Sequence, residues 1–223
     1  GITAKQGGLA AMVCGVVEAR HLLREIKPSL VVGFGGYASL PTMLAARWQR
    51  LPTLIHEQNA ILGRANWLLA PMAESIAISF EEVARLHKRH KAKTMRTGNP
   101  VRPTISAIRS TPYPPLGTDD SLNLLVMGGS QGAAVFGHVL PDAVALMPAA
   151  ARARLHISQQ CRAEDIDRVK TIYEALNINA VIESFFDDVP QRLRQAHLVI
   201  GRAGASTVAE ATAAGRPAIL VPY

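Results

Sequence analysis

The sequence predicts an α/β fold with two Rossmann-like, doubly wound domains, each built on a parallel β-sheet. Short apolar segments alternate with helical patterns along the 223 residues, as they do in βαβ units. Two of the apolar segments end in glycine-rich turns, at 33–36 and 128–132, and a helical pattern follows each turn. A turn of this kind is typical of one nucleotide-binding half of this fold, so the two turns indicate two halves.

Residues 1–102 are expected to form the first domain. A helix is predicted over 8–26, where apolar residues such as Leu9 and Val16 recur at helical spacing. The other elements of this half are predicted as strands at 30–34, 53–56 and 75–79 and as helices at 40–50, 62–70 and 81–90.

Residues 103–120 are expected to form a linker, because Pro112, Pro114 and Pro115 make this stretch rich in turns. Residues 121–223 then form the second domain. Its elements are predicted as strands at 122–127, 154–158, 180–182, 197–201 and 218–221 and as helices at 131–147, 164–176 and 207–214. The chain opens just before a helix and stops just after a strand, so both domains are expected to be incomplete.

Composition narrows the class of protein. Hydrophobic residues make up 48% of the chain, yet no apolar run is long enough to cross a bilayer. Cys14 and Cys161 form neither a metal spacing nor a disulfide framework, which favours a reducing cytoplasm. The net charge of +7, concentrated in 85–102, indicates an anionic partner, although a solvated basic face is the alternative. No aromatic residue interleaves with these basic residues, so nucleic acid is not expected.

The turn at Gly128, Gly129 and Gly132 is predicted to bind phosphate. Its glycines let the backbone approach an anion closely, and the amides and dipole of the following helix favour negative charge. The stretch is neither a Walker loop nor a Gly-x-Gly-x-x-Gly fingerprint, which argues against an NTPase and against a nicotinamide enzyme.

Polar clusters mark other candidate sites. His56, Glu57 and Asn59 follow a strand, where parallel sheets present functional residues, although a surface turn is the alternative. Arg102 can clamp an anion or stack on a base, or it is a simple surface arginine.

Glu210 has two open interpretations: a capping box with Thr207, or acceptance of hydrogen bonds from ribose hydroxyls. Phe185 and Phe186 follow a short strand and can flank a flat base, with at least one of them in the core. Asp187 and Asp188 do not form an Asp-x-Asp motif, and no metal site is expected.

Five segments together resemble the MurG family of bacterial glycosyltransferases, and they occur in the family's order. They are 35–39, 56–59, 97–102, 128–133 and 202–210. The resemblance implies the GT-B fold, with two domains facing a cleft. It also implies transfer of N-acetylglucosamine from UDP-GlcNAc to the MurNAc 4-hydroxyl of lipid I, which gives lipid II for peptidoglycan. No cofactor or metal is implied.

The resemblance also implies roles for single residues. The donor UDP-GlcNAc would meet Asn59, Arg102, Ser130, Gln131, Phe185, Phe186 and Glu210. Within this set Ser130 and its neighbouring amides would hold the phosphates, Glu210 the ribose, and the backbone at 185–186 the uracil. Tyr37, Ser39, His56 and Glu57 would line the acceptor side, which takes the undecaprenyl-diphosphate-linked substrate.

The resemblance implies inversion by single displacement, with the helix after Gly128 stabilising the departing UDP. The family's first glycine-rich loop, which ends in a histidine proposed for catalysis, would precede residue 1, and a sugar-reading glutamine would follow residue 223. The catalytic base is therefore unassigned, and Glu57 is the weak candidate among the residues present.

A peripheral position on the cytoplasmic face of the inner membrane is expected, with an alternative in which the first helix simply packs on its sheet. The surface would consist of Met12, Val13, Val16, Val17, Arg20, Arg24, Lys27 and Trp48. Three alternative functions stay open: a UDP-GlcNAc 2-epimerase or other GT-B relative, a non-catalytic UDP-binding fragment, and a Rossmann oxidoreductase.

Overall fold

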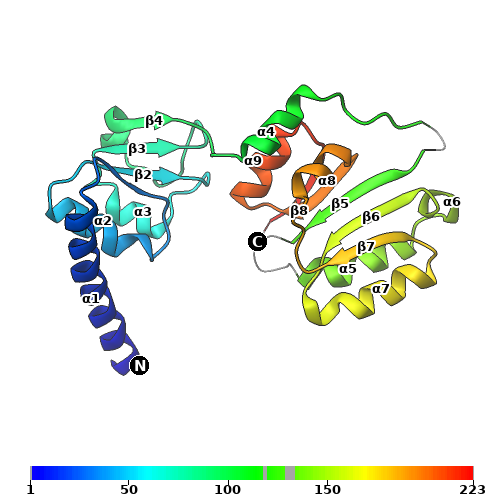
Figure 1. Cartoon of the computed structure of the whole chain (residues 1–223), viewed down its shortest axis with the longest axis horizontal. Coiled ribbons are helices and arrows are strands. Elements are labelled where there is room, and N and C mark those ends of the chain that lie inside the picture. The colour runs from blue at the N-terminus through cyan, green and yellow to red at the C-terminus, as the bar shows by residue number, and fades with distance from the viewer. Residues whose placement is uncertain (1, 118–119, 129–133, 223) are drawn as a thin grey trace. The chain divides into compact units, whose positions relative to one another are not determined.

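A computed structural model describes residues 2–117, 120–128 and 134–222. The described chain forms two compact units, Gly1–Asn99 (unit 1) and Pro100–Tyr223 (unit 2). Each unit has its own parallel sheet (Figure 1). The buried residues form one core in unit 1 and two in unit 2. The two-domain α/β prediction is therefore confirmed.

Unit 1 is a four-stranded parallel sheet in the order β1-β2-β3-β4. Its core joins strand residues such as Ile55 and Ile76 to Leu23, Met43 and Leu69 from three helices. The elements are α1 (Ile2–Ile26), β1 (Val31–Gly33), α2 (Ser39–Trp48), β2 (Thr53–Glu57), α3 (Arg64–Leu69), β3 (Ser75–Ile78), the 3₁₀ helix η1 (Lys88–Lys93) and β4 (Thr94–Arg96).

The predicted helix at 81–90 is wrong. The chain there makes an isolated bridge between Ile61 and Ala84, and Arg85 then takes a left-handed conformation with φ of 67°. A non-glycine residue in that conformation interrupts an α-helix. Val83 and Leu86 still pack against the core, so the apolar spacing that suggested a helix serves an irregular segment instead.

Unit 2 has a five-stranded parallel sheet in the order β7-β6-β5-β8-β9. Strand β5 alternates between two cores, with Leu124 and Val126 facing one and Leu125 and Met127 facing the other. Such alternation confirms a doubly wound sheet covered on both faces. The strands are β5 (Leu122–Met127), β6 (Leu155–Gln160), β7 (Asn179–Glu183), β8 (Leu198–Arg202) and β9 (Ala218–Val221).

The helices of unit 2 cover both faces of this sheet (Figure 1). Residues of α5 and α7 pack in one core, and residues of α4, η2 and α8 pack in the other. These helices are α4 (Pro103–Ser106), η2 (Ala107–Ser110), α5 (Ala134–Ala145), α6 (Ala149–Arg152), η3 (Ala163–Asp165), α7 (Ile166–Ala175), α8 (Val189–Gln195) and α9 (Ala205–Ala213).

The stretch expected to be a linker, 103–120, is partly built into unit 2. Its first residues form α4 and η2, and Ile105 and Ile108 are buried in a core with Leu193. Later in the same stretch, the Tyr113 hydroxyl donates a 2.7 Å hydrogen bond to the His197 carbonyl. The turn-rich composition did not reveal these anchoring residues. The helix α8 was also missed, because it is only seven residues long.

Candidate functional site

Unit 2 presents a candidate nucleotide site where its strand order reverses. β5 lies at the centre of the sheet, with β6 on one side and β8 on the other. Ligands of open α/β sheets bind beyond the carboxyl ends of the strands at such a point. Gly128 directly follows β5 and is buried. The other predicted phosphate-turn residues, Gly129, Ser130, Gln131 and Gly132, lie outside the described residues.

Beyond β8, a close approach of backbone to helix fixes the start of α9. A Cβ atom on Gly201 would lie 2.9 Å from Thr207 Cγ2 and 3.4 Å from the Met127 carbonyl. Thr207 is itself buried, inside a helix whose N-cap is Gly204. The capping-box interpretation of Glu210 is therefore wrong, since it needs Thr207 at the N-cap.

Glu210 instead pairs with Arg102, another predicted donor residue. Arg102 Nη2 donates to Glu210 Oε1 at 3.1 Å. The Glu210 side chain is 16% exposed and the Arg102 side chain 52% exposed. Arg102 is the N-cap residue of α4, so the pair joins the start of α4 to α9. Two predicted site residues, 108 positions apart, are thus brought together.

The two phenylalanines after β7 have different environments. Phe185 is 66% exposed, whereas Phe186 is 1% exposed and belongs to the unit 2 core. The Phe186 side chain is therefore a structural anchor. A ligand can meet Phe185 or the backbone of this loop.

Unit 1 carries the predicted acceptor residues near the ends of β1 and β2. A tight turn follows β1, with Gly35 and Gly36 at φ of 80° and 74°, values that favour glycine. Ser39 Oγ donates to the Gly36 carbonyl at 2.8 Å and so closes this turn. Tyr37 is exposed at its tip.

His56 is buried and bonded at both ring nitrogens. Its Nε2 lies 2.9 Å from the Gly98 carbonyl, and its Nδ1 lies 3.2 Å from Gln58 Nε2. Because a carbonyl can only accept, Nε2 donates in the first of these hydrogen bonds. The Phe34 ring packs against it, with centroids 5.4 Å apart. His56 therefore ties the end of β2 to residue 98.

Glu57 is held by a dense set of hydrogen bonds and is only 1% exposed. Its Oε1 accepts from the backbone amide and the Nδ2 of Asn59, at 3.0 and 3.1 Å. Its Oε2 accepts from the amide of Gly63 at 2.8 Å and from Asn66 Nδ2 at 2.9 Å. Four donors on one buried carboxylate favour a structural role, namely fixing the loop that carries Asn59.

Asn66 is a member of this network that sequence reasoning missed. It is buried in α3, and its Nδ2 also donates to the His56 carbonyl at 3.1 Å. Its Oδ1 is buried without a hydrogen-bond partner. The same amide lies 3.2 Å from where a Cβ on Gly35 would stand. The available signal was a polar residue inside an apolar helical pattern, at 62–70.

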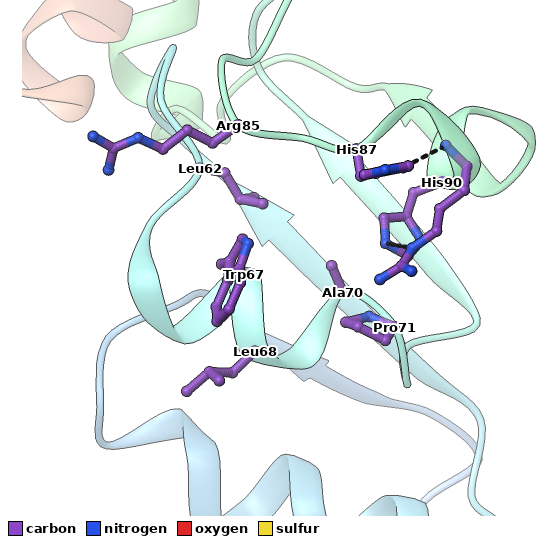
Figure 2. Close-up of a pocket in the computed structure, with 9 residues that line it drawn as sticks. Leu62, Trp67, Leu68, Ala70, Pro71, Arg85, His87 and His90 are labelled. Atoms are coloured by element: carbon purple, nitrogen blue, oxygen red, sulfur yellow. Dashed lines mark hydrogen bonds between the residues drawn. The ribbon is translucent and has the colours of Figure 1, made fainter.

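A pocket of about 320 Å³ lies in unit 1 between α3 and the irregular segment that precedes β4 (Figure 2). Its floor is apolar, and Trp67 stands in it between Leu62 and Leu68 (Figure 2). Its rim is basic, with Arg85 and Arg89, and no acidic residue lines it. The structure therefore places an aromatic ring beside basic residues that are separated from it in the sequence.

A buried histidine in the same pocket lacks a positive charge. Arg89 Nε donates to His90 Nε2 at 3.2 Å, so this nitrogen acts as an acceptor. Burial lowers the pKa of His90 below its ordinary value, and the neighbouring charges of Lys93 and Arg89 lower it further. The positive charge of this surface therefore comes from exposed arginine and lysine side chains.

The residues expected to contact a membrane are divided between the core and the surface of unit 1. Met12 and Val16 pack against the unit 1 core, as the alternative interpretation required. Val13 and Val17 are exposed on the other side of α1. Arg20 lies over the Trp48 ring at 4.5 Å, and Arg24 and Lys27 are exposed.

No described helix combines the length and the apolar character needed to cross a membrane. No group of three or more His, Cys, Asp or Glu side chains among the described residues is placed to hold a metal ion.

Comparison with known proteins identifies relatives of both units. The N-terminal domain model of glycosyltransferase family 28 matches residues 7–78, and the C-terminal domain model of that family matches residues 123–223. A UDP-N-acetylglucosamine–N-acetylmuramyl-(pentapeptide) pyrophosphoryl-undecaprenol N-acetylglucosamine transferase from Rhodospirillum centenum is 53% identical over 209 residues. That match covers 94% of this chain and 55% of the relative. The chain thus spans about half the length of the curated relatives it matches.

Solved structures give the same fold. MurG from Acinetobacter baumannii superposes with a TM-score of 0.69 at 30% identity, over 96% of this chain and 58% of that protein. A UDP-GlcNAc 2-epimerase from Neisseria meningitidis, solved with UDP-GlcNAc bound, gives a TM-score of 0.62. Its identity is 14%, over 94% of this chain and 63% of that protein, so it supports the fold alone.

The predicted GT-B fold is confirmed by the MurG structure together with the two parallel-sheet units. The five segments that suggested the family extend through both units, and the Rhodospirillum centenum relative matches 94% of the chain at 53% identity. This chain belongs to the MurG family within glycosyltransferase family 28.

Proposed function

We propose that this protein transfers N-acetylglucosamine from UDP-GlcNAc to the MurNAc 4-hydroxyl of lipid I, giving lipid II for peptidoglycan. The observation that carries the proposal is the 53% identity to a transferase named for this reaction, over 94% of the chain. The pairing of Arg102 with Glu210, on the helix that follows β8, supports it.

The donor binds unit 2 in this proposal. Glu210 accepts hydrogen bonds from the ribose hydroxyls through its partly exposed carboxylate, and Arg102 lies beside it at 3.1 Å. The backbone beside the exposed Phe185 reads the uracil edge. Ser130, Gln131 and the amides after Gly128 hold the diphosphate, and Asn59 contacts the transferred sugar.

The reaction is a single displacement with inversion at the anomeric carbon. The acceptor hydroxyl attacks this carbon while the bond to UDP breaks, and negative charge builds on the leaving diphosphate. Backbone amides and the dipole of the helix after Gly128 stabilise that charge. The base is unassigned, and the four hydrogen bonds of Glu57 make it a poor carrier of the proton.

The acceptor binds unit 1, at the turn that holds Tyr37 and Ser39 and at the neighbouring His56. The two hydrogen bonds that hold the buried His56 ring support an orienting role here. The diphosphate of the lipid-linked substrate meets the glycine turn at 35–36 beside Gly36, where a Cβ atom would have nothing within 4 Å and the backbone is open for close approach.

Peripheral contact with an anionic membrane on its cytoplasmic face is part of the same proposal. The exposed Val13 and Val17 on α1 and the neighbouring Arg24 and Lys27 support it. Sedimentation with vesicles of phosphatidylglycerol tests it. Replacement of both valines by serine should reduce the bound fraction, and an unchanged fraction contradicts the α1 surface.

The transfer proposal is tested by two variants, Glu210→Ala and Ser130→Ala, in an assay with UDP-GlcNAc and a lipid I analogue. Each should depress formation of the disaccharide-lipid. Unchanged rates in both variants contradict the proposal. The product distinguishes the proposed transferase from the 2-epimerase alternative, because a 2-epimerase makes UDP-ManNAc. Binding of UDP without turnover identifies a non-catalytic UDP-binding chain.

A further inference from the structure

Arg192 on α8 makes three contacts around the loop that the proposed function assigns to uracil. Its Nε donates to Asp188 Oδ1 at 2.7 Å, and its Nη1 donates to Ser158 Oγ at 2.8 Å. Its guanidinium carbon lies 4.0 Å from the centroid of the Phe186 ring. One side chain thus connects the end of the loop, strand β6 and the buried phenylalanine.

These contacts restrain the loop at several points. The loop leaves β7 after Glu183 and enters α8 at Val189, with Asp188 as the N-cap residue. Asp188 makes no side-chain capping bond, so its carboxylate is available to Arg192. Ser158 lies in the middle of β6, a rigid part of the sheet. The loop is therefore braced against the sheet and not only against its own helix.

Arginine suits this position better than any other residue. The planar guanidinium carries several donors, so it can bond a carboxylate and a hydroxyl at once while one face lies on an aromatic ring. The Arg192 side chain is only 19% exposed, and this shielding makes its ion pair less sensitive to salt than a surface pair. Lysine can supply the positive charge, but its ammonium group cannot donate to the carboxylate and the hydroxyl in the two directions that a guanidinium spans.

The exposed and buried phenylalanines show what this bracing achieves. Phe186 is fixed in the core beneath Arg192, and the adjacent Phe185 is directed to the surface. Recognition of a base edge by backbone groups needs those groups held to a fraction of an ångström. A loop anchored on one side only would leave them free to move.

We propose that Arg192 is a positioning residue that sets base selectivity, by holding the 184–188 loop so that its backbone reads uracil. The inference rests on the proposed binding of UDP by unit 2. Arg192 touches Asp188, Ser158 and Phe186, and acts on the nucleotide only through this loop.

The test is calorimetric titration of the chain with UDP and with CDP, which differ at the base edge alone. Arg192→Gln should raise the Kd for UDP about tenfold and leave the Kd for CDP within about twofold, because the ribose and phosphate contacts are untouched. Arg192→Lys should retain part of the selectivity. Ser158→Ala should give a smaller loss in the same direction.

Arg194→Ala is the matched control, because Arg194 lies on the same helix and its side chain is exposed. It should leave both Kd values unchanged. Thermal unfolding of each variant separates loss of folding from loss of selectivity.

Each outcome of the titration decides the inference. Selective loss of UDP binding in Arg192→Gln supports it. Equal loss of UDP and CDP binding, or no loss of either, overturns it and leaves UDP binding by the wild type intact. If the wild-type chain binds neither nucleotide, the proposed donor site itself is overturned, and the inference with it.

Discussion

Glu57 in unit 1 and Glu210 in unit 2 were both candidate site residues, and their surroundings differ sharply. Glu57 is 1% exposed and accepts four hydrogen bonds from its own unit. Glu210 is partly exposed and has one ion pair, with an exposed arginine. A carboxylate whose capacity is filled internally holds structure, whereas one with capacity left can bind a ligand.

The largest expected effect is on stability, from Glu57→Ala. The change leaves the backbone amides of Asn59 and Gly63 without their acceptor, and Asn66 Nδ2 keeps only the His56 carbonyl. We expect unit 1 to lose about 3 kcal/mol of unfolding free energy, the scale of hydrogen bonds to a charged group. Urea unfolding measures it. The exposed Glu74 gives the control, Glu74→Ala, which should change little; an equal loss in both would remove the distinction.

The opposite pattern is expected for Glu210→Gln, with a large effect on ligand binding and a small one on stability. Loss of the charge weakens hydrogen bonds to ribose hydroxyls, and we expect the Kd for UDP to rise about 10- to 30-fold. Calorimetry gives the Kd, and thermal unfolding gives the stability. A strongly destabilised variant would place Glu210 in the same structural class as Glu57.

A smaller effect is expected for Arg102→Ala. The Arg102–Glu210 pair is largely exposed on the arginine side, so its loss should cost less than about 1 kcal/mol of stability. The Kd for UDP should rise about threefold, since Glu210 loses an orienting partner while keeping its charge. A double-mutant cycle with Glu210→Gln measures the coupling. Strict additivity of the two changes would show that the pair does not act as a unit.

The smallest expected effect is a loss of stability at acidic pH through His90. Folding lowers the pKa of His90 from 6.5, so below that pH the unfolded chain binds a proton that the folded chain resists. Stability from this residue is therefore retained above pH 6.5 and declines as the pH falls. Urea midpoints at about pH 7.5 and pH 5.5 should show a decline that His90→Gln reduces and the exposed, distant His21→Gln does not. Equal declines in all three proteins would contradict it.

Much of the fold was predictable because glycine turns and apolar strands are local signals. The predicted strand at 122–127 matches β5, and the two-unit organisation followed from two such turns. The segment at 81–90 was not predictable in this way, because its shape depends on the left-handed Arg85 and on a bridge to Ile61. Contacts between distant segments leave little trace in a local pattern.

The site residues show the same limit. The sequence named both Glu57 and Glu210 as site residues, and burial and hydrogen bonding show how far their surroundings differ. The sequence could place one phenylalanine of 185–186 in the core but not say which. Arg192 was missed because it bonds Ser158, 34 positions away, and Asn66 because its partners His56 and Glu57 lie in a different element.

The position of Glu210 depends on a methyl group that is absent. Gly201 lets α9 approach β8 so closely that an added Cβ would overlap Thr207, one helical turn before Glu210. Thr207 is buried and β-branched, so it cannot rotate away, and the whole helix would have to shift. The glycine in β8 therefore determines where α9 places the Glu210 carboxylate.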